Sequence, residues 1–111
     1  MPADCLFCKI IAGEIPGNKA AETDKILAFH DIAPQAPVHV LVIHKQHTPG
    51  VADTTDNAIF GDLLGGVRDT ARQLGLSDYR VVLNNGAEAG QSVFHMHAHI
   101  LGGRPLKWPP G

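Results

Sequence analysis

The amino-acid sequence predicts an α+β fold, a five-stranded and mainly antiparallel sheet with two helices. Two observations predict the elements: several short stretches rich in β-branched residues indicate strands, and one long stretch repeats its apolar residues with helical spacing. A third observation predicts the topology, because most connections are too short for helical crossovers and favour antiparallel pairing. The length of 111 residues is typical of one domain, so we expect a single domain over residues 1–111.

The predicted elements of the first half are short. Residues 5–12 predict a helix, because its apolar residues share one side and Gly13 can stop it. Residues 33–37 contain two prolines, which cannot donate to a sheet ladder, so this segment is predicted to be a turn. Strands are expected over residues 19–22, 26–31 and 39–44.

The second half begins with the longest predicted helix. Asp53 or Thr54 can cap its start, and Gly75 can end it. Its apolar residues recur at three- and four-residue spacing, at Ile59, Phe60, Leu63, Leu64, Val67, Ala71 and Leu74. Two further strands are expected over residues 79–84 and 94–101, joined by a loop of small residues over 85–92.

Composition excludes several classes of protein. A hydrophobic share of 44% and a net charge of −2 are typical of a folded globular chain rather than a disordered one. No run of Lys or Arg offers a surface for nucleic acid, and no apolar stretch is long enough to span a membrane. The N-terminus lacks the features of a signal peptide, and two cysteines are too few for a disulfide-stapled secreted scaffold. We therefore expect a cytoplasmic protein with no nucleic-acid or membrane partner.

Three histidines alternate near the C-terminus. Residues two apart on a strand point to the same face, so His95, His97 and His99 are predicted to line one face. The intervening residues Met96, Ala98 and Ile100 are then predicted to face the core. Three interpretations of this face are open. It is a solvent-exposed polar stripe, its histidines bind a metal ion, or one imidazole is a nucleophile and its neighbours fix its tautomer or transfer protons.

The loop before this strand favours chemistry at phosphorus. It offers amides, a hydroxyl and backbone N–H groups, the donors that stabilise an oxyanion or a phosphate. It is not a P-loop, since Gly90 is followed by Gln91, and Ser92 is not in a hydrolase nucleophile elbow, since Phe94 stands where glycine is needed. A plain hairpin loop is the alternative interpretation.

The segment His95-Met96-His97-Ala98-His99-Ile100-Leu101 matches the H-φ-H-φ-H-φ-φ signature of the histidine-triad (HIT) family of nucleotide hydrolases and transferases. Residues 29–37, 90–93 and 101–104 and the ending Trp108-Pro109-Pro110-Gly111 resemble the Hint branch, the purine nucleoside phosphoramidases. The resemblance spans nearly the whole chain. Fhit-type dinucleoside-polyphosphate hydrolases share the triad but lack that ending. The resemblance implies a HIT-like fold whose sheet continues across a homodimer.

The resemblance also implies an activity, hydrolysis of the P–N bond of purine nucleoside 5′-phosphoramidates to AMP or GMP and an amine. His97 would be the nucleophile of a covalent nucleotidyl-histidine intermediate, with His99 and His39 in a proton relay. Ser92 would hydrogen-bond the departing amine. The implied nucleotide-binding residues are Phe29, His30, Asp31, Ile32, Asn84, Gly90, Gln91, Ser92, His97, His99 and Trp108. From the residues alone, Asp31 is instead a turn-initiating aspartate before Ala33-Pro34.

The two cysteines form a C-x-x-C at Cys5 and Cys8. By resemblance to bacterial members, Cys5, Cys8, His47 and His95 would hold a structural zinc ion, with no cofactor required for catalysis. The alternatives are free buried thiols or a thioredoxin-type redox pair, although the latter lacks its usual strand-then-helix context.

Two other functions stay open at this point, a Fhit-like dinucleoside polyphosphate hydrolase and a non-catalytic zinc- or nucleotide-binding module. Two positions depart from the family pattern. His44 stands where proline is common, beside the proposed metal ligand His47. Ala89 stands where close members have glycine, and the loop is expected to shift if that position requires a positive φ.

Overall fold

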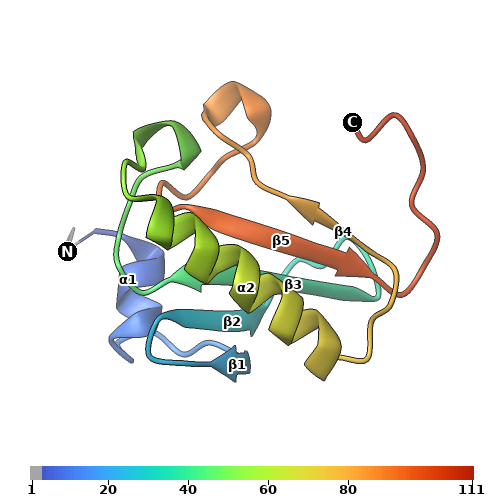
Figure 1. Ribbon diagram of the computed structural model, residues 1–111, viewed down its shortest axis with the longest axis horizontal. Coiled ribbons are helices and arrows are strands. Elements are labelled where there is room, and N and C mark those ends of the chain that lie inside the picture. Colours follow the sequence, from blue (N-terminus) through green and yellow to red (C-terminus); the bar gives the residue numbers. More distant parts are fainter. Residues whose placement is uncertain (1–3) are drawn as a thin grey trace.

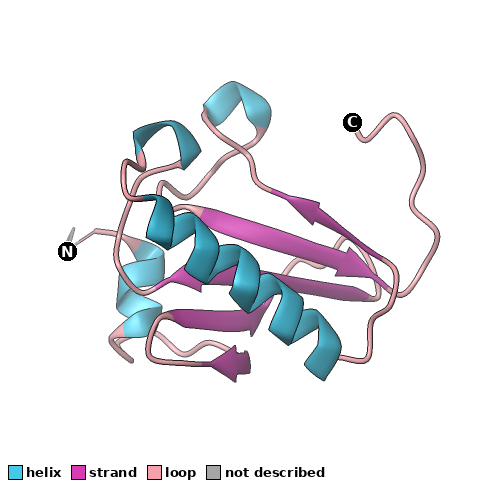
Figure 2. Cartoon of the chain, viewed as in Figure 1, coloured by secondary structure: helices cyan, strands magenta, loops and turns pink. Residues whose placement is uncertain are grey.

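The computed structural model describes residues 4–111 and shows one five-stranded sheet with a helix on each face (Figure 1). The strand order is β1-β2-β3-β5-β4, and every neighbouring pair is antiparallel. The predicted fold class is therefore confirmed. The elements, coloured by type in Figure 2, are α1 (Leu6–Ile11), β1 (Lys19–Glu22), β2 (Ile26–His30), β3 (Val38–His44), α2 (Asn57–Gln73), β4 (Tyr79–Val82) and β5 (His97–Gly102).

Both faces of the central strands are buried. On one face α2 packs over alternate residues of β2, β3 and β5, and on the other α1 packs over the residues between them. Strands β2 and β3 therefore consist of almost continuous apolar sequence. Met96, Ala98 and Ile100 lie in the core beneath α2, as predicted, which leaves His97 and His99 on the α1 face.

Helix α1 begins and ends close to the predicted positions. The Sγ of Cys5 accepts a hydrogen bond from the backbone N–H of Cys8 and caps its start. Gly13 follows its end with φ = 79°, a conformation that glycine adopts without strain. Cys5, a candidate metal ligand, therefore also caps the first turn of this helix.

The predicted cap of α2 is wrong. Asp56 caps the helix, with its Oδ1 accepting from Ala58 N at 3.0 Å, whereas Asp53 ends a short 3₁₀ turn at Val51–Asp53. The hydroxyl of Thr54 is already used, since it donates to the carbonyl of Gly50 at 2.7 Å. Gly75 follows the helix with φ = 75°, as predicted for its end.

Strand β5 begins at His97, not at residue 94 as predicted, and β4 ends at Val82 instead of residue 84. The backbone before β5 leaves the ladder, because Met96 N–H donates to the Thr48 carbonyl at 2.8 Å. His95 therefore precedes the strand, and its ring lies beside Cys5, Cys8 and His47, near the start of α1.

Ala89 does not require a positive φ. It ends a short 3₁₀ turn, Ala87–Ala89, and the positive φ values fall on the flanking Gly86 (95°) and Gly90 (100°). Alanine is therefore compatible with the backbone of this loop, and the expected shift has no basis in its φ angle.

Candidate functional site

A cavity of about 370 Å³ lies on the α1 face of the sheet. Its lining combines apolar side chains, among them Phe7, Ile10 and Phe29, with the imidazoles of His97 and His99. Such a cavity suits a ligand with a flat apolar body and a charged group. Its complete lining is Leu6, Phe7, Ile10, Ile15, Pro16, Gly17, Asn18, Phe29, His30, Asp31, Ile32, Leu41, Ser92, Val93, His97 and His99.

A larger and shallower depression of about 700 Å³ lies between residues 75–80 and 103–106. Its lining contains no histidine or cysteine. The smaller cavity is therefore the candidate functional site, because His97 and His99 line it.

His97 is held in one tautomer. Its Nδ1 lies 2.8 Å from the carbonyl oxygen of His95, which can only accept, so Nδ1 carries the proton and Nε2 carries the lone pair. Burial lowers the pKa of His97 below its ordinary value of 6.5. The side chain therefore offers a neutral, nucleophilic Nε2 near pH 7.

His39 and His99 form a directed hydrogen bond beside it. The backbone N–H of Gln35 donates to His39 Nδ1 at 3.0 Å, so the proton of a neutral His39 is on Nε2, which lies 2.9 Å from His99 Nδ1. His99 then carries its own proton on Nε2. Burial and the neighbouring imidazoles of His97 and His39 lower the pKa of His99 to about 4. The three rings thus form a chain, with centroids 5.2 Å and 5.0 Å apart.

Asp31 serves two sets of contacts. Its Oδ1 accepts from Ala33 N at 2.8 Å, which confirms the turn interpretation, and its Oδ2 lies 3.5 Å from His39 Nε2. Its carboxylate also lines the cavity, together with its predicted neighbours Phe29, His30 and Ile32. The turn and the binding interpretations of Asp31 are therefore compatible.

Of the residues predicted in the donor loop, only Ser92 lines the cavity. Gln91 is buried and braces the loop, since its Nε2 donates to the carbonyls of Pro49 and Val93 and its Oε1 accepts from Gly86 N. Asn84 packs against Gly90 outside the cavity lining. The side chain of Gln91 supports the loop and is not directed at a ligand.

Trp108 lies apart from the cavity of its own chain. Its side chain is 82% exposed, and the segment after β5 runs away from the sheet (Figure 1). Trp108 is therefore not among the residues that the structure brings to this cavity.

Helix α1 contributes residues to the cavity that sequence reasoning missed. The ring of Phe7 meets His97 edge-on at a centroid distance of 5.0 Å and Phe29 at 5.4 Å, and Ile10 lines the same wall. In the sequence these residues look like any apolar helix face. Only the docking of α1 against β2 and β3 shows that the face borders a cavity.

The four predicted metal ligands gather in one cluster, with their ligand atoms all within 4.8 Å of one another. His95 Nδ1 lies 3.4 Å from Cys5 Sγ, 3.6 Å from Cys8 Sγ and 3.1 Å from His47 Nδ1. Cys8 Sγ lies 3.4 Å from His47 Nδ1. Cys5 and Cys8 are free of any disulfide, and His95 is completely buried.

The donor set fits a zinc ion. A tetrahedral zinc with bonds of about 2.0–2.3 Å holds its ligand atoms about 3.3–3.8 Å apart, close to the observed separations. His95 Nε2 donates to the carbonyl of His44 at 2.8 Å, so its Nδ1 lone pair faces the two thiols. Burial and the hydrogen bond with Cys5 raise the pKa of Cys8 to about 11, so a cation is needed to make this thiol ionise near neutral pH.

A second group of metal-ligand type, Asp31, His39 and His99, also lies within 4.8 Å. Here the Gln35 N–H occupies His39 Nδ1 and leaves the proton on Nε2, the atom that faces the other two residues. These three residues are therefore connected by hydrogen bonds and are not arranged to bind a metal ion.

Comparison with known proteins gives a consistent result. The HIT domain family matches residues 12–106. An uncharacterized HIT-like protein of Synechocystis sp. is 53% identical over 114 residues, which is 100% of both chains. A 14 kDa zinc-binding protein of Zea mays is 48% identical over 96% of this chain and 87% of its own.

Solved structures of HIT proteins have the same fold as this chain. A HIT family hydrolase from Legionella pneumophila superposes with a TM-score of 0.93 at 46% identity, over 97% of this chain and 100% of its own. A histidine triad nucleotide-binding protein from Candida albicans gives a TM-score of 0.83 at 37% identity, over 96% and 83% of the two chains. Within residues 4–111 no helix is long and apolar enough to cross a membrane. The chain belongs to the HIT domain family.

Proposed function

We propose that this protein hydrolyses the P–N bond of purine nucleoside 5′-phosphoramidates, releasing AMP or GMP and an amine. The observation that carries the proposal is the fixed tautomer of His97, whose free Nε2 belongs to a side chain that lines a mainly apolar cavity. The similar proteins described as a HIT family hydrolase and as a histidine triad nucleotide-binding protein support a nucleotide substrate.

In the first step, Nε2 of His97 attacks the α-phosphorus, so an N–P bond forms while the P–N bond to the amine breaks. The imidazole becomes positively charged and still donates from Nδ1 to the carbonyl of His95, which stabilises that charge. The amine leaves with a proton, and the hydroxyl of Ser92 is the cavity group placed to hydrogen-bond it.

In the second step, water attacks the phosphorus and the bond to His97 breaks, which returns a neutral imidazole and releases the nucleoside monophosphate. The Nε2–H of His99 is a donor for the phosphate oxygens, and the Nε2–H of His39 supports it from behind. The departing amine takes up one proton in the first step and the attacking water gives one up in the second, so the protons balance over the two steps by exchange with solvent.

The nucleoside end is built from rings and aliphatic chains. Phe7, Phe29 and Ile10 form a dry wall for a base, since aromatic and branched side chains bury a flat ring favourably. We assign the carboxylate of Asp31 to the ribose hydroxyls, as their hydrogen-bond acceptor. Asn84, Gly90 and Gln91 shape the loop that presents Ser92, and we assign the backbone N–H groups there to the phosphate.

We further propose that Cys5, Cys8, His47 and His95 hold a structural zinc ion. The ion would keep the thiols ionised and tie α1 to the end of β3, and it takes no part in the two steps above. The zinc-binding description of the Zea mays relative supports this assignment.

We also propose that residues 1–111 form one domain that works in the cytoplasm as a homodimer, with the sheet continued across the interface. Trp108 would then reach the cavity of the partner. Its 82% exposure within a single chain supports this placement, since the ring is free to contact a partner.

The test measures AMP release from adenosine 5′-monophosphoramidate and from diadenosine polyphosphate, for the wild type, His97→Ala and the control Asp69→Ala. Asp69 is an exposed residue of α2 paired with Arg68, far from the chemistry. We expect fast release from the phosphoramidate, a loss of at least about 10³-fold in His97→Ala, and no change in the control.

Other outcomes redirect the assignment. Release mainly from the polyphosphate would favour the Fhit-like hydrolase. Retained turnover in His97→Ala would refute the nucleophile. Binding of AMP without any turnover, measured by calorimetry, would leave a non-catalytic nucleotide-binding module.

A further inference from the structure

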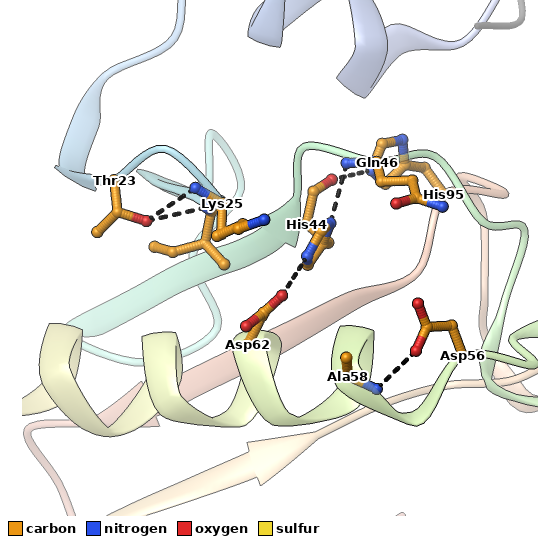
Figure 3. A network of polar contacts seen from close by, with 9 residues as sticks. Thr23, Lys25, His44, Gln46, Asp56, Ala58, Asp62 and His95 are labelled. Atoms are coloured by element: carbon orange, nitrogen blue, oxygen red, sulfur yellow. Dashed lines mark hydrogen bonds and ion pairs between the residues drawn. The ribbon is translucent and has the colours of Figure 1, made fainter.

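His44, the residue that departs from the family pattern, lies at the end of β3 with a side chain only 7% exposed. Both ring nitrogens are engaged (Figure 3): Nδ1 accepts from the backbone N–H of Gln46 at 2.9 Å, and Nε2 donates to Asp62 Oδ2 at 3.0 Å. A neutral His44 therefore has a single tautomer and a single ring orientation.

The partner carboxylate comes from a rigid element. Asp62 belongs to α2, and its sequence neighbour Leu63 is 1% exposed in the core beneath that helix. The position of Asp62 is thus set by helix packing, and the contact with His44 transmits that position to the end of β3. Figure 3 shows the Asp62 side chain directed from the helix toward the His44 ring.

The backbone of His44 makes the next contact. Its carbonyl accepts from His95 Nε2 at 2.8 Å, which turns Nδ1 of the buried His95 ring toward the thiols of Cys5 and Cys8. The ring of His44 also holds Gln46 N–H, the residue directly before His47. The side chain of His44 therefore fixes a short turn. This turn carries the candidate metal ligand His47 and the His44 carbonyl, which orients the ligand His95.

We propose that His44 and Asp62 form a positioning pair for the metal cluster: they hold the His44 carbonyl where it keeps His95 in the Nε2–H form, with Nδ1 free to bind the ion. This inference rests on the proposed metal site. It gives a role to the side chain of His44, which takes no part in the proposed reaction. Groups that fix the orientation of a metal-bound imidazole commonly change metal affinity by about 10–100-fold when removed.

The variants distinguish a role of the His44–Asp62 pair in orienting His95 from a purely structural contact between α2 and β3. Asp62→Ala removes the acceptor, whereas Asp62→Asn keeps an amide oxygen at the same place for His44 Nε2–H. Asp69→Ala removes an exposed aspartate from the same helix and serves as the control. His44→Ala removes the ring and is the stronger variant; where it fails to fold, Asp62→Ala decides.

The first measurement is Co²⁺ affinity in the metal-free protein, by competition with a chelator of known affinity and by the absorption of the Co²⁺–thiolate site. We expect Asp62→Ala and His44→Ala to bind about 10–100-fold more weakly than the wild type, and Asp62→Asn and Asp69→Ala to bind within about threefold of it. Equal affinity in Asp62→Ala and Asp69→Ala would overturn the proposal.

The second measurement is the nitrogen chemical shifts of the His95 ring in the metal-free protein, which report its tautomer. We expect one Nε2–H form in the wild type and a mixture in Asp62→Ala; a single unchanged form in both would overturn the proposal. If the wild type binds neither Co²⁺ nor Zn²⁺, the metal site itself fails, and the tautomer measurement alone still decides whether the pair orients His95.

Discussion

At the scale of single residues, backbone carbonyls decide what the histidines can do. The carbonyl of His95 fixes the proton of His97 on Nδ1, and the carbonyl of His44 fixes the proton of His95 on Nε2. Two neighbours in one motif therefore present opposite ring nitrogens, one to the substrate cavity and one to the cysteines. The same residue type is thereby suited to the two proposed functions, because its hydrogen-bond acceptor differs.

His99 gives a pH-dependent prediction at this scale. Its pKa is about 4 in the folded chain and near 6.5 when unfolded, so between these values the unfolded chain binds the extra proton. Its contribution to stability is therefore complete above pH 6.5 and is lost as the pH falls toward 4. We expect the free energy of unfolding of the wild type to drop over this window more than that of His99→Gln, measured by urea denaturation. Parallel losses in both proteins would contradict the shift.

At the scale of elements, α1 is too short to be stable alone. It has six residues, below the length at which an isolated helix holds in water, and it is fixed by its apolar face and by the cluster that contains Cys5 and Cys8. Phe7 lies between these two cysteines and meets both His95 and His97 edge-on. The proposed metal site is thus linked to the substrate cavity through one turn of helix.

Metal removal tests this link. We expect a chelator to lower Tm by several degrees, since each lost kcal/mol corresponds to roughly 4 °C or more for a domain of about this size. The thiols of Cys5 and Cys8 should then react faster with a thiol reagent, because α1 loosens. Turnover should persist below the new Tm, because the proposed steps do not use the metal ion. Loss of turnover with the fold intact by circular dichroism would point to a metal enzyme.

At the scale of the whole molecule, several large apolar side chains are left exposed. Trp108 in the C-terminal segment and Tyr79 and Val81 on the edge strand β4 are among them. An edge strand with exposed apolar residues favours pairing with a second copy. A homodimer would cover this surface and bring Trp108 toward a cavity that its own chain does not let it reach.

Mixing two variants, each of which we expect to lack activity as a homodimer, tests that arrangement. Trp108→Ala removes the tail residue and His97→Ala removes the nucleophile, so a mixed dimer has one site with an intact His97 and an intact Trp108 from its partner. If subunits exchange freely, we expect the mixture to regain about a quarter of wild-type activity, since half of the dimers have one of two sites complete. No gain over the separate variants, with exchange verified by mass spectrometry, would place Trp108 outside the partner's site.

Most of the fold followed from local patterns. The apolar periodicity of α2, the alternation of Met96, Ala98 and Ile100, and Gly75 as a helix end depend on neighbours within a few residues, so they were predictable. The cap at Asp56 and the late start of β5 were not, because each depends on a competing hydrogen bond, Thr54 to Gly50 and Met96 to Thr48.

The sequence by itself determined the class of the fold, the family signature and the residue types of both candidate sites. Only the tertiary structure brought Cys5 within 3.4 Å of His95, 90 residues away, placed Phe7 against His97, and withdrew the side chain of Gln91 from the cavity. It alone also gave His44 its contacts with Asp62 and His95. The physical reason is that periodicity and caps act over one or two turns, whereas tautomers, ligand geometry and cavity walls are set by contacts between distant segments.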